Sequence, residues 1–465
     1  MMRTRLISAL ALTLTLVGAQ LVPVIAQDAP ALPEVLTLPE QIAGGRDVTI
    51  TVSNMPPTDQ TELRAEWEAQ AARFQEMYPN VTIEGLELEY DPAAYVALAA
   101  GDQLPTLFLT YFTEPQKFID QGVVADLTPY LEAAGVGDVF NPEILSIMSR
   151  DGATYGIPLN AYALGLAYNI DMLAAAGFDA PPATWDELAE MATTLTDRDN
   201  NVAGFAFIND GSGATGWHFT DIAYGFGATP EDIISTNEDG TFTAAYGEGA
   251  TADALAYVHG LRWTQNVLPG ATLDWASLSE ALVSERVAMV IYAGDQFNFD
   301  YYQFPEADLT KFGFAPTPAG PGGHITLTGG NLYMVSASAS DDQREAATYF
   351  HLWRQLDPAE VQAQLEVTQE AVGMPILPLY VGDYQTAWEA FRVPYNVLPV
   401  ENYSLFNEAI KSGEVTLQPE PATAVQDYYT EVGVVVSEVL SNENIDTAAR
   451  LAESADEFQA FVLDR

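Results

Sequence analysis

Hydrophobic positions follow two alternating periods from residue 47 onward. Residues 48–54, VTITVSN, alternate apolar and polar side chains and predict a strand, whereas residues 58–78 place Leu63, Trp67 and Phe74 near one face of a helix. The same alternation predicts strands at 81–88 and 105–112 and helices at 92–102 and 115–122. A strand–helix rhythm of this kind predicts an α/β fold with a mainly parallel sheet.

The second half of the chain repeats this rhythm and then becomes helical. Thr184 with Glu187, and Ser340 with Gln343, have the spacing of capping boxes that open helices. From about Pro375 the pattern is mostly helical, and two long amphipathic helices are predicted near the C-terminus. The predicted elements here are strands at 202–208, 286–292 and 329–336 and helices at 184–195, 250–266, 277–285, 422–440 and 446–463.

Polar and aromatic side chains gather directly after or before the predicted strands. In α/β sheets, ligands bind at the ends of strands. Aromatic rings pack against the C–H faces of sugars, while amides and carboxylates exchange hydrogen bonds with hydroxyl groups, so this mixture favours a neutral polyol as ligand. The strand-end groups are Thr110 to Glu114, Asn160 with Tyr162, Ser212 with Thr215 and Trp217, Gly294 to Phe297, and Gly329 to Asn331, with Trp275 before a helix.

The first 26 residues have the pattern of a signal peptide. Arg3 and Arg5 form a basic start, a long apolar run follows, and Val24-Ile25-Ala26 has the small-residue spacing of a cleavage site after Ala26. Residues 27–46 are rich in proline and lack periodicity, which is typical of a linker or a loose N-terminal arm. We therefore expect an exported protein, either periplasmic or extracellular.

Composition excludes several kinds of function. The chain has no cysteine, so thiolate metal sites, a cysteine nucleophile and a lipid-modified N-terminal cysteine are excluded. Lysine and arginine number 17 against 65 aspartates and glutamates, for a net charge of −48, and such a surface repels nucleic acid and anionic membranes.

Catalytic motifs are mostly absent. The sequence has no G-x-S-x-G elbow, no P-loop lysine and no H-E-x-x-H pair, so no cofactor or metal is expected. The four histidines are far apart and are interpreted as surface or core-edge residues. Residues 197–201, DRDNN, resemble the start of a calcium loop but lack its glycine and final glutamate, which favours a solvated turn.

Residues 155–196 resemble the extracellular solute-binding proteins of ABC importers, family 1, the sugar-binding group related to maltose-binding protein. Weaker similarities follow in the order expected for that family, at 99–110, 279–296 and 329–353 and in the VGMPIL segment at 372–377. Thr106 stands where the family usually has aspartate. The motifs that carry the main resemblance are Tyr155 to Pro158, Tyr168-Asn169-Asp171, Ala176-Gly177, Pro181-Pro182 and Thr184 to Leu188.

The resemblance implies a two-lobe, type II periplasmic-binding-protein-like fold whose lobes close on a ligand by hinge motion. It implies a signal peptide at 1–26, a linker at 27–46, lobe 1 at 47–160 and 320–374, and lobe 2 at 161–319 and 375–465. Residues 159–164 would then be the first crossing between lobes. It also implies a sugar ligand and a membrane permease as partners, and we expect a monomer.

The polar and aromatic residues at strand ends, together with this resemblance, predict the ligand-binding residues. The aromatic residue of the penultimate helix has only a loose match. The predicted residues are Asn54, Thr110, Tyr111, Thr113, Glu114, Asn160, Tyr162, Trp217, Trp275, Gly294, Asp295, Gln296, Phe297, Gly330, Asn331 and Tyr428.

Two alternatives stay open at this point. The acidic composition would also suit a receptor for a polyamine, although polyamine sites need several converging carboxylates. The same aromatic and acidic residues would serve an exported glycoside hydrolase, whose paired carboxylates the sequence cannot place relative to each other.

Overall fold

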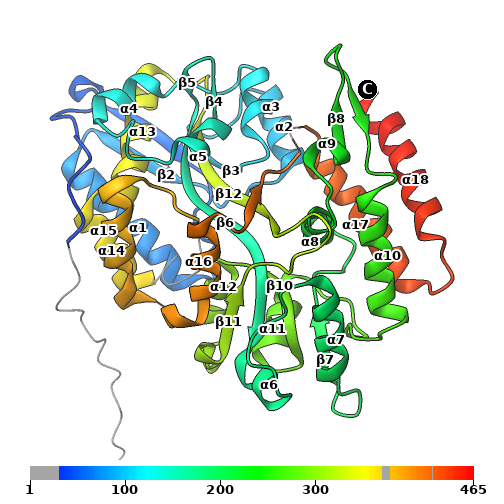
Figure 1. Ribbon diagram of the computed structural model, residues 1–465. Coiled ribbons are helices and arrows are strands. Elements are labelled where there is room, and N and C mark those ends of the chain that lie inside the picture. The colour runs from blue at the N-terminus through cyan, green and yellow to red at the C-terminus, as the bar shows by residue number, and fades with distance from the viewer. Residues whose placement is uncertain (1–30, 369–376, 397, 422, 465) are drawn as a thin grey trace, which may run out of the picture.

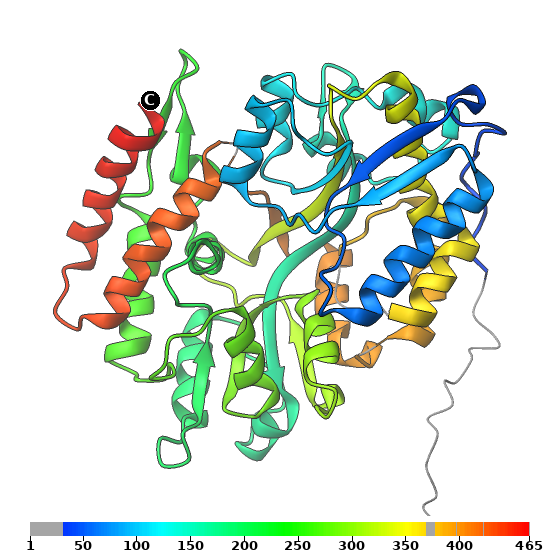
Figure 2. The ribbon, with the colours of Figure 1, turned by 180° about the vertical axis from the view of Figure 1, so that it is seen from behind.

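The computed structural model describes residues 31–368, 377–396, 398–421 and 423–464 (Figure 1). The predicted signal peptide lies outside these residues, and so does most of the VGMPIL segment. The largest sheet of the described residues has nine strands, in the order β2-β1-β3-β12-β6-β10-β7, with β11 paired to β6 and β13 paired to β12; β4 with β5 and β8 with β9 form two small separate sheets. Helices cover both faces of this sheet (Figures 1 and 2).

The first lobe is built on the parallel strands β1 and β2, whose register pairs Val48 with Val81 and Val52 with Gly85. Apolar side chains of these strands pack with those of α1 and α13, including Phe74, Phe350 and Trp353. The elements around this core are β1 Val48–Val52, α1 Thr61–Met77, β2 Val81–Gly85, α2 Pro92–Ala100, β3 Leu107–Tyr111, α3 Pro115–Asp120, α4 Thr128–Ala134, α5 Pro142–Ile147, β4 Ser149–Arg150, β5 Ala153–Thr154, α13 Asp341–Leu356, α14 Pro358–Thr368, α15 Gly382–Arg392 and α16 Ser404–Ser412.

The second lobe has its own core on the other end of the sheet. Leu166, Phe205 and Ile291 pack there beneath α7, α8, α10, α17 and α18. The elements of this lobe are α6 Ile170–Ala175, α7 Trp185–Leu195, β7 Ala203–Ala206, α8 Gly213–Gly225, α9 Pro230–Ile233, β8 Ile234–Thr236, β9 Phe242–Ala244, α10 Ala250–Trp263, α11 Trp275–Val283, β10 Val287–Ala293, α12 Gln296–Gln303, β11 Phe312–Ala315, β13 Thr416–Gln418, α17 Val425–Ser441 and α18 Thr447–Phe458.

Two long strands, β6 (Gly156–Asn169) and β12 (Ile325–Val335), belong to both lobes. The first half of β6 pairs with β12, and its second half pairs with β10 and β11. All of these pairings are antiparallel, so the prediction of a mainly parallel sheet is wrong at the centre of the molecule. β6 crosses the junction first and β12 crosses back, so the two strands run in opposite directions and pair antiparallel. The limits of the two lobes given above stay a prediction, but α15 and α16, which that prediction assigns to lobe 2, place Tyr384 and Phe406 in the same hydrophobic cluster as β1 and β2.

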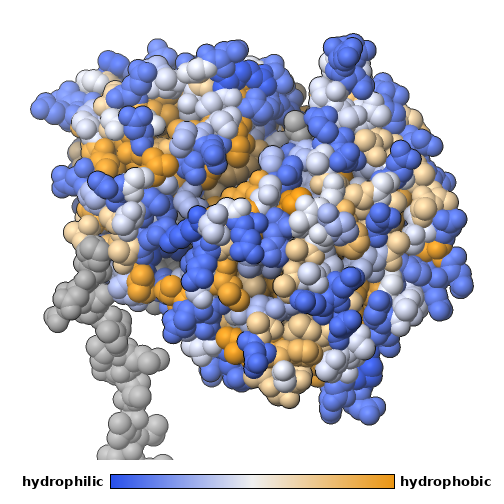
Figure 3. Space-filling view, viewed as in Figure 1, coloured by the Kyte–Doolittle hydropathy of each residue, from blue (hydrophilic) through white to orange (hydrophobic). Residues whose placement is uncertain are grey.

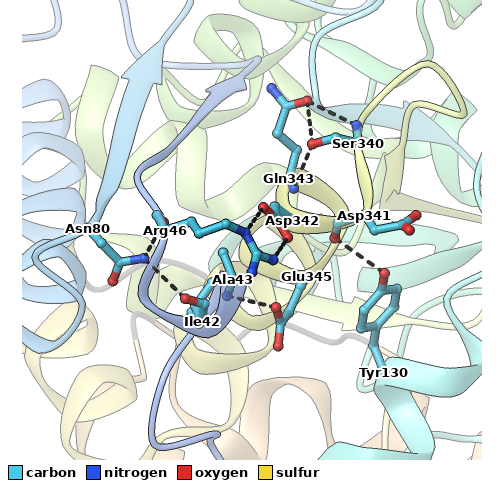
Figure 4. A network of polar contacts seen from close by, with 10 residues as sticks. All are labelled: Ile42, Ala43, Arg46, Asn80, Tyr130, Ser340, Asp341, Asp342, Gln343 and Glu345. Atoms are coloured by element: carbon cyan, nitrogen blue, oxygen red, sulfur yellow. Dashed lines mark hydrogen bonds and ion pairs between the residues drawn. The ribbon is translucent and has the colours of Figure 1, made fainter.

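Residues 31–46, assigned from the sequence to a linker or loose arm, are packed against the first lobe. Thr37 N donates to Ala134 O at 2.9 Å, and the Tyr78 hydroxyl donates to Pro39 O at 2.7 Å. Arg46 Nε donates to Asp342 Oδ2 at 2.8 Å in the first turn of α13 (Figure 4).

The same figure shows the cap of α13. The capping box of Ser340 and Gln343 is confirmed. The corresponding prediction for α7 is half right, because Thr184 accepts from Glu187 N but the Glu187 carboxylate accepts from Ala183 N instead.

Candidate functional site

The crossing of β6 and β12 explains the amide inside the apolar strand. Asn331 pairs with Asn160, and Leu332 then pairs with Pro158, so Leu159 is an extra residue in a bulge. The side-chain Oδ1 of Asn160 accepts a hydrogen bond from Asn331 N at 3.0 Å. The polar residue therefore satisfies a backbone donor where the strand ladder is interrupted.

Asp221 on α8 also accepts a hydrogen bond from a backbone N–H, on the other side of the crossing. Its Oδ1 accepts from Leu327 N at 2.8 Å and from the Thr326 hydroxyl at 3.2 Å. The side chain is fully buried, and burial raises the pKa of its carboxyl to about 7. Asp221 thus fixes β12 to the second lobe just before the strand enters the first.

Glycines at the crossing leave room for aromatic rings. A Cβ at Gly330 would lie 2.3 Å from the Phe112 ring and 2.6 Å from Asn160 O. A Cβ at Gly329 would lie 2.7 Å from the Tyr162 ring. The two glycines are therefore required by close packing of these rings on the strand.

Three aromatic residues form a continuous wall beside the crossing. The ring centroids of Tyr162 and Trp217 are 6.0 Å apart, and those of Trp217 and Trp275 are also 6.0 Å apart. Trp217 is 9% exposed, whereas Trp275 is 36% exposed and is the most accessible of the three. We call Tyr162, Trp217 and Trp275 the aromatic wall; such a surface can stack against the apolar face of a ring.

Two carboxylates, those of Asp295 and Glu420, lie close enough to Tyr162 of the aromatic wall to affect its pKa. The pKa of the Tyr162 hydroxyl is raised well above its usual range, first by burial and then by the negative charges of Asp295 and Glu420. Burial raises the pKa of Asp295 to about 6 and that of Glu420 to about 8. Glu420 Oε1 also accepts a hydrogen bond from the Tyr429 hydroxyl at 2.9 Å.

One chain of hydrogen bonds joins the two lobes across the site. Gln426 Nε2, at the start of α17, donates to Thr113 Oγ1 at 3.2 Å. The Thr113 hydroxyl donates to Glu114 Oε1 at 3.3 Å, and Lys117 Nζ lies 3.3 Å from Glu114 Oε2. The pair Gln426–Thr113 therefore links α17 of the second lobe to the loop before α3 of the first.

A cavity of about 510 Å³ lies along the same junction. Asn54, Asn160 and Asp295 line it from both lobes. Hydrophilic residues prevail on the opposite face of the molecule, with scattered hydrophobic patches between them (Figure 3). Volumes of this size are typical of small-molecule sites. The other lining residues are Met55, Pro56, Pro57, Gln60, Leu63, Glu66, Trp67, Gln70, Glu89, Leu159, Asn298, Tyr333, Arg354, Gln355, Val361, Gln364, Leu365, Leu379, Tyr380 and Trp388.

The structure brings many of the predicted residues to this junction but not all. Tyr428 is fully buried in the second core, where its hydroxyl lies 3.4 Å from that of Thr220. Phe297 is fully buried against Tyr292, and Thr110 is also fully buried. The residues that lie at the crossing, the cavity or the adjoining loops are Asn54, Tyr111, Thr113, Glu114, Asn160, Tyr162, Trp217, Trp275, Gly294, Asp295, Gln296, Gly330 and Asn331.

Three residues of the junction were not predicted from the sequence: Glu420, Gln426 and Arg354. The Pro-Glu-Pro sequence around Glu420 interrupts the predicted helical region and was the available signal for a further crossing. The interpretation of the histidines is also wrong for His218 and His351, which are fully buried because they pack among aromatic rings.

The described residues contain no group of three or more histidine, aspartate or glutamate side chains that could hold a metal ion. None of the helices in the described part of the chain has the length and apolarity that crossing a bilayer requires.

Comparisons with known proteins agree on one architecture. A sequence profile described as bacterial extracellular solute-binding protein matches residues 57–351. YcjN, a putative ABC transporter periplasmic-binding protein of Escherichia coli K12, is 25% identical over 314 residues, which are 65% of this chain and 67% of that protein.

Two solved structures superpose on most of the chain. An ABC transporter solute-binding protein from Thermotoga lettingae bound with α-D-tagatose gives a TM-score of 0.69 at 18% identity, covering 89% of this chain and 99% of its own. Maltose-bound MalE3 of T. maritima gives 0.68 at 19% identity, covering 88% and 99%. At these identities the likeness shows a shared fold of the two-lobe type.

Proposed function

The chain belongs to the bacterial extracellular solute-binding protein family, and from this premise we propose that it is the receptor of an ABC importer for a carbohydrate or polyol. It binds this solute reversibly between its two lobes and delivers it to the membrane permease. The chain is exported for this task, and it acts as a monomer without cofactor or catalysis.

The observation that carries the proposal is the aromatic wall of Tyr162, Trp217 and Trp275 beside the amide-rich crossing. The wall supplies a surface for the C–H face of a sugar ring, and Trp275 is its most exposed member. Asn54 and Asp295 line the adjoining cavity and supply acceptors and donors for hydroxyl groups. The ligands named for the two structural relatives, tagatose and maltose, are of the same class.

A ligand screen tests this proposal. Thermal-shift measurements on the full exported chain would compare sugars and polyols with polyamines and amino acids, and calorimetry would follow each positive result. We expect stabilisation by at least one sugar or polyol with one-to-one stoichiometry, because binding to the native state alone raises the melting temperature. Stabilisation by polyamines alone would contradict the proposal, as would steady hydrolysis of an aryl glycoside.

A further inference from the structure

Three polar side chains are joined by hydrogen bonds beneath the loop that follows β10. They are Ser279 on α11, Tyr292 on β10 and Asp300 on α12, and all three are fully buried. Ser279 Oγ lies 2.6 Å from the Tyr292 hydroxyl, which lies 2.8 Å from Asp300 Oδ1 and 2.7 Å from Oδ2. We call these three residues the buried network. At its outer end, Gln296 Nε2 donates to Ser279 Oγ at 3.0 Å.

The direction of each hydrogen bond in the buried network follows from Asp300. Burial raises the pKa of its carboxyl to about 6, so the carboxylate is the main form at about pH 7.5. A carboxylate only accepts hydrogen bonds, so the Tyr292 hydroxyl gives its hydrogen to Asp300. The oxygen of Tyr292 then has only lone pairs left for Ser279, and the Ser279 hydroxyl must donate to it.

This direction fixes the amide of Gln296. A glutamine amide can exchange its two ends by a half turn, so a partner of fixed direction decides which end faces inward. Because Ser279 gives its hydrogen to Tyr292, it can only accept from Gln296, and an amide donates through its nitrogen alone. The nitrogen of Gln296 therefore faces the protein, and its carbonyl oxygen faces away from Ser279.

The carbonyl oxygen of Gln296 is available to a ligand. Oε1 accepts no hydrogen bond from the described residues, and it is not one of the polar atoms shielded from solvent. The amide meets α11 one turn after Trp275 of the aromatic wall. Asp295 and Asn298, its neighbours at the start of α12, line the cavity. Gln296 is thus flanked by the wall on one side and by cavity-lining residues on the other, where α11 and α12 lie side by side (Figure 1).

We propose that Gln296 is a specificity-determining residue, whose carbonyl oxygen accepts a hydrogen bond from one hydroxyl group of the bound carbohydrate. The buried network holds the amide in this orientation, so Ser279, Tyr292 and Asp300 are positioning residues. At this position the site favours a ligand group that donates a hydrogen over one that only accepts, such as fluorine or an ether oxygen. This inference rests on the proposed function and names the ligand group that Gln296 recognises.

Neutron diffraction on the deuterated, ligand-free full chain at about pH 7.5 tests the orientation directly. We expect deuterium on Ser279 Oγ directed toward Tyr292, and the deuterated nitrogen of Gln296 facing Ser279. An amide with its oxygen toward Ser279 would overturn the inference, whether or not a sugar binds.

Calorimetry with fluorinated sugars tests recognition of the hydroxyl group. The probes are D-glucose, D-galactose, D-mannose and maltose, each with its monodeoxyfluoro analogues, in which fluorine replaces one hydroxyl and removes its hydrogen. For the parent sugar that binds most tightly, at least one analogue should bind the wild-type chain about five- to ten-fold more weakly. In Gln296→Met that analogue and its parent should bind within about two-fold of each other, because the acceptor is gone.

Two further variants separate positioning from structure. Ser279→Ala keeps the hydrogen bond between Tyr292 and Asp300 but releases the amide of Gln296, so the discrimination should fall to about two-fold. A purely structural defect would weaken parent and analogue equally and leave their ratio unchanged. Gln362→Met is the matched control, because the exposed amide of Gln362 also donates to a side chain, that of Glu366 at 2.7 Å, and its loss should leave the ratio unchanged.

Each contrary result of the calorimetry has a distinct meaning. Equal binding of every analogue and its parent by the wild-type chain would overturn the recognition of a hydroxyl by Gln296. Discrimination that persists in Gln296→Met would show that another residue is its cause. Binding of no carbohydrate or polyol in the thermal-shift screen would remove the proposed function and the role of Gln296 with it, while neutron diffraction would still decide the orientation of the amide.

Discussion

Asp221 is a buried carboxylic acid, and its burial disfavours the charged form. Because its pKa rises from 3.8 to about 7 on folding, its favourable contribution to stability is complete below about pH 4 and is lost as the pH rises through 7. We expect wild-type protein to lose free energy of unfolding between pH 5 and pH 8.5, with at most about 3 kcal/mol from this residue, because the loss runs from pH 5 to about pH 7. Urea unfolding at the two pH values measures this loss.

Asp221→Asn should reduce that loss, because the amide oxygen can still accept from Leu327 N without carrying a charge. Asp239→Asn is the control, since hydrogen bonds from Thr241 lower the pKa of the exposed Asp239 and its titration ends well below pH 5. An undiminished loss in Asp221→Asn would show that other buried acids, such as Asp295, Asp300 and Glu420, account for the pH dependence.

Trp275 is the member of the aromatic wall that substitution can test with least damage to the core. Its side chain is 36% exposed, so Trp275→Ala should change the melting temperature little. Loss of a stacking surface for the ligand should weaken binding by about five- to thirty-fold, or roughly 1–2 kcal/mol. Calorimetry with the best ligand of the screen measures this effect.

Trp263→Ala serves as the control for Trp275→Ala, because Trp263 packs on α10 and donates its indole N–H to Val439 O, away from the wall. Its affinity should match that of the wild type. Equal affinities in all three proteins would mean that the ligand does not stack on Trp275.

Single residues could be predicted only as far as local pattern reaches, because their partners are set by the tertiary fold. The unusual position of Asn160 in an apolar strand predicted a crossing near residues 159–164, and β6 exchanges β12 for β10 as its partner at Ala163 and Leu164. The hydrogen bond from Asn331 N to Asn160, however, depends on a residue 171 positions away. The resemblance offers Tyr428 as a loose match to an aromatic ligand contact of the penultimate helix, yet periodicity does not say which face of that helix meets the cleft, and the ring is in the core.

At the scale of elements, β12 depends on glycines at its crossing. Gly330→Ala should destabilise the fold by about 1–3 kcal/mol, because the new methyl group meets the Phe112 ring and the fixed carbonyl of Asn160. Gly137→Ala is the matched control, since a Cβ there meets no atom within 4 Å. Chemical denaturation compares the two; equal stability would show that Phe112 moves freely aside.

The existence of most helices and strands could be predicted, because their periods are local properties of the chain. The extent of the crossing strands could not. The sequence predicted β12 from residue 329, but the strand begins at Ile325, since residues 325–328 find partners in β6 and β13 of the second lobe. Partners of this kind are defined only by the tertiary fold.

At the scale of the whole molecule, the Gln426–Thr113 hydrogen bond holds the two lobes together. Gln426→Ala and Thr113→Val should each weaken ligand affinity by about two- to ten-fold, as expected for the loss of one side-chain hydrogen bond. The double variant should be no weaker than either single one, because both remove the same bond. Additive losses would show that the two residues act independently.

Small-angle scattering on the same variants measures whether the hydrogen bond affects closure of the two lobes. The ligand-free double variant should have a larger radius of gyration than the ligand-free wild type if the bond favours the closed arrangement. An unchanged radius together with unchanged affinity would show that closure does not use this bond.

The position of β12 in the sheet has a consequence for how the protein is made. β12 lies between β3 and β6, although both are synthesised more than 150 residues earlier. Until residues 325–335 leave the ribosome, β3 and β6 each have an open edge where β12 will pair. The centre of the sheet therefore cannot form until more than two thirds of the chain has been synthesised, so most of the polypeptide is made before its two longest strands can pair.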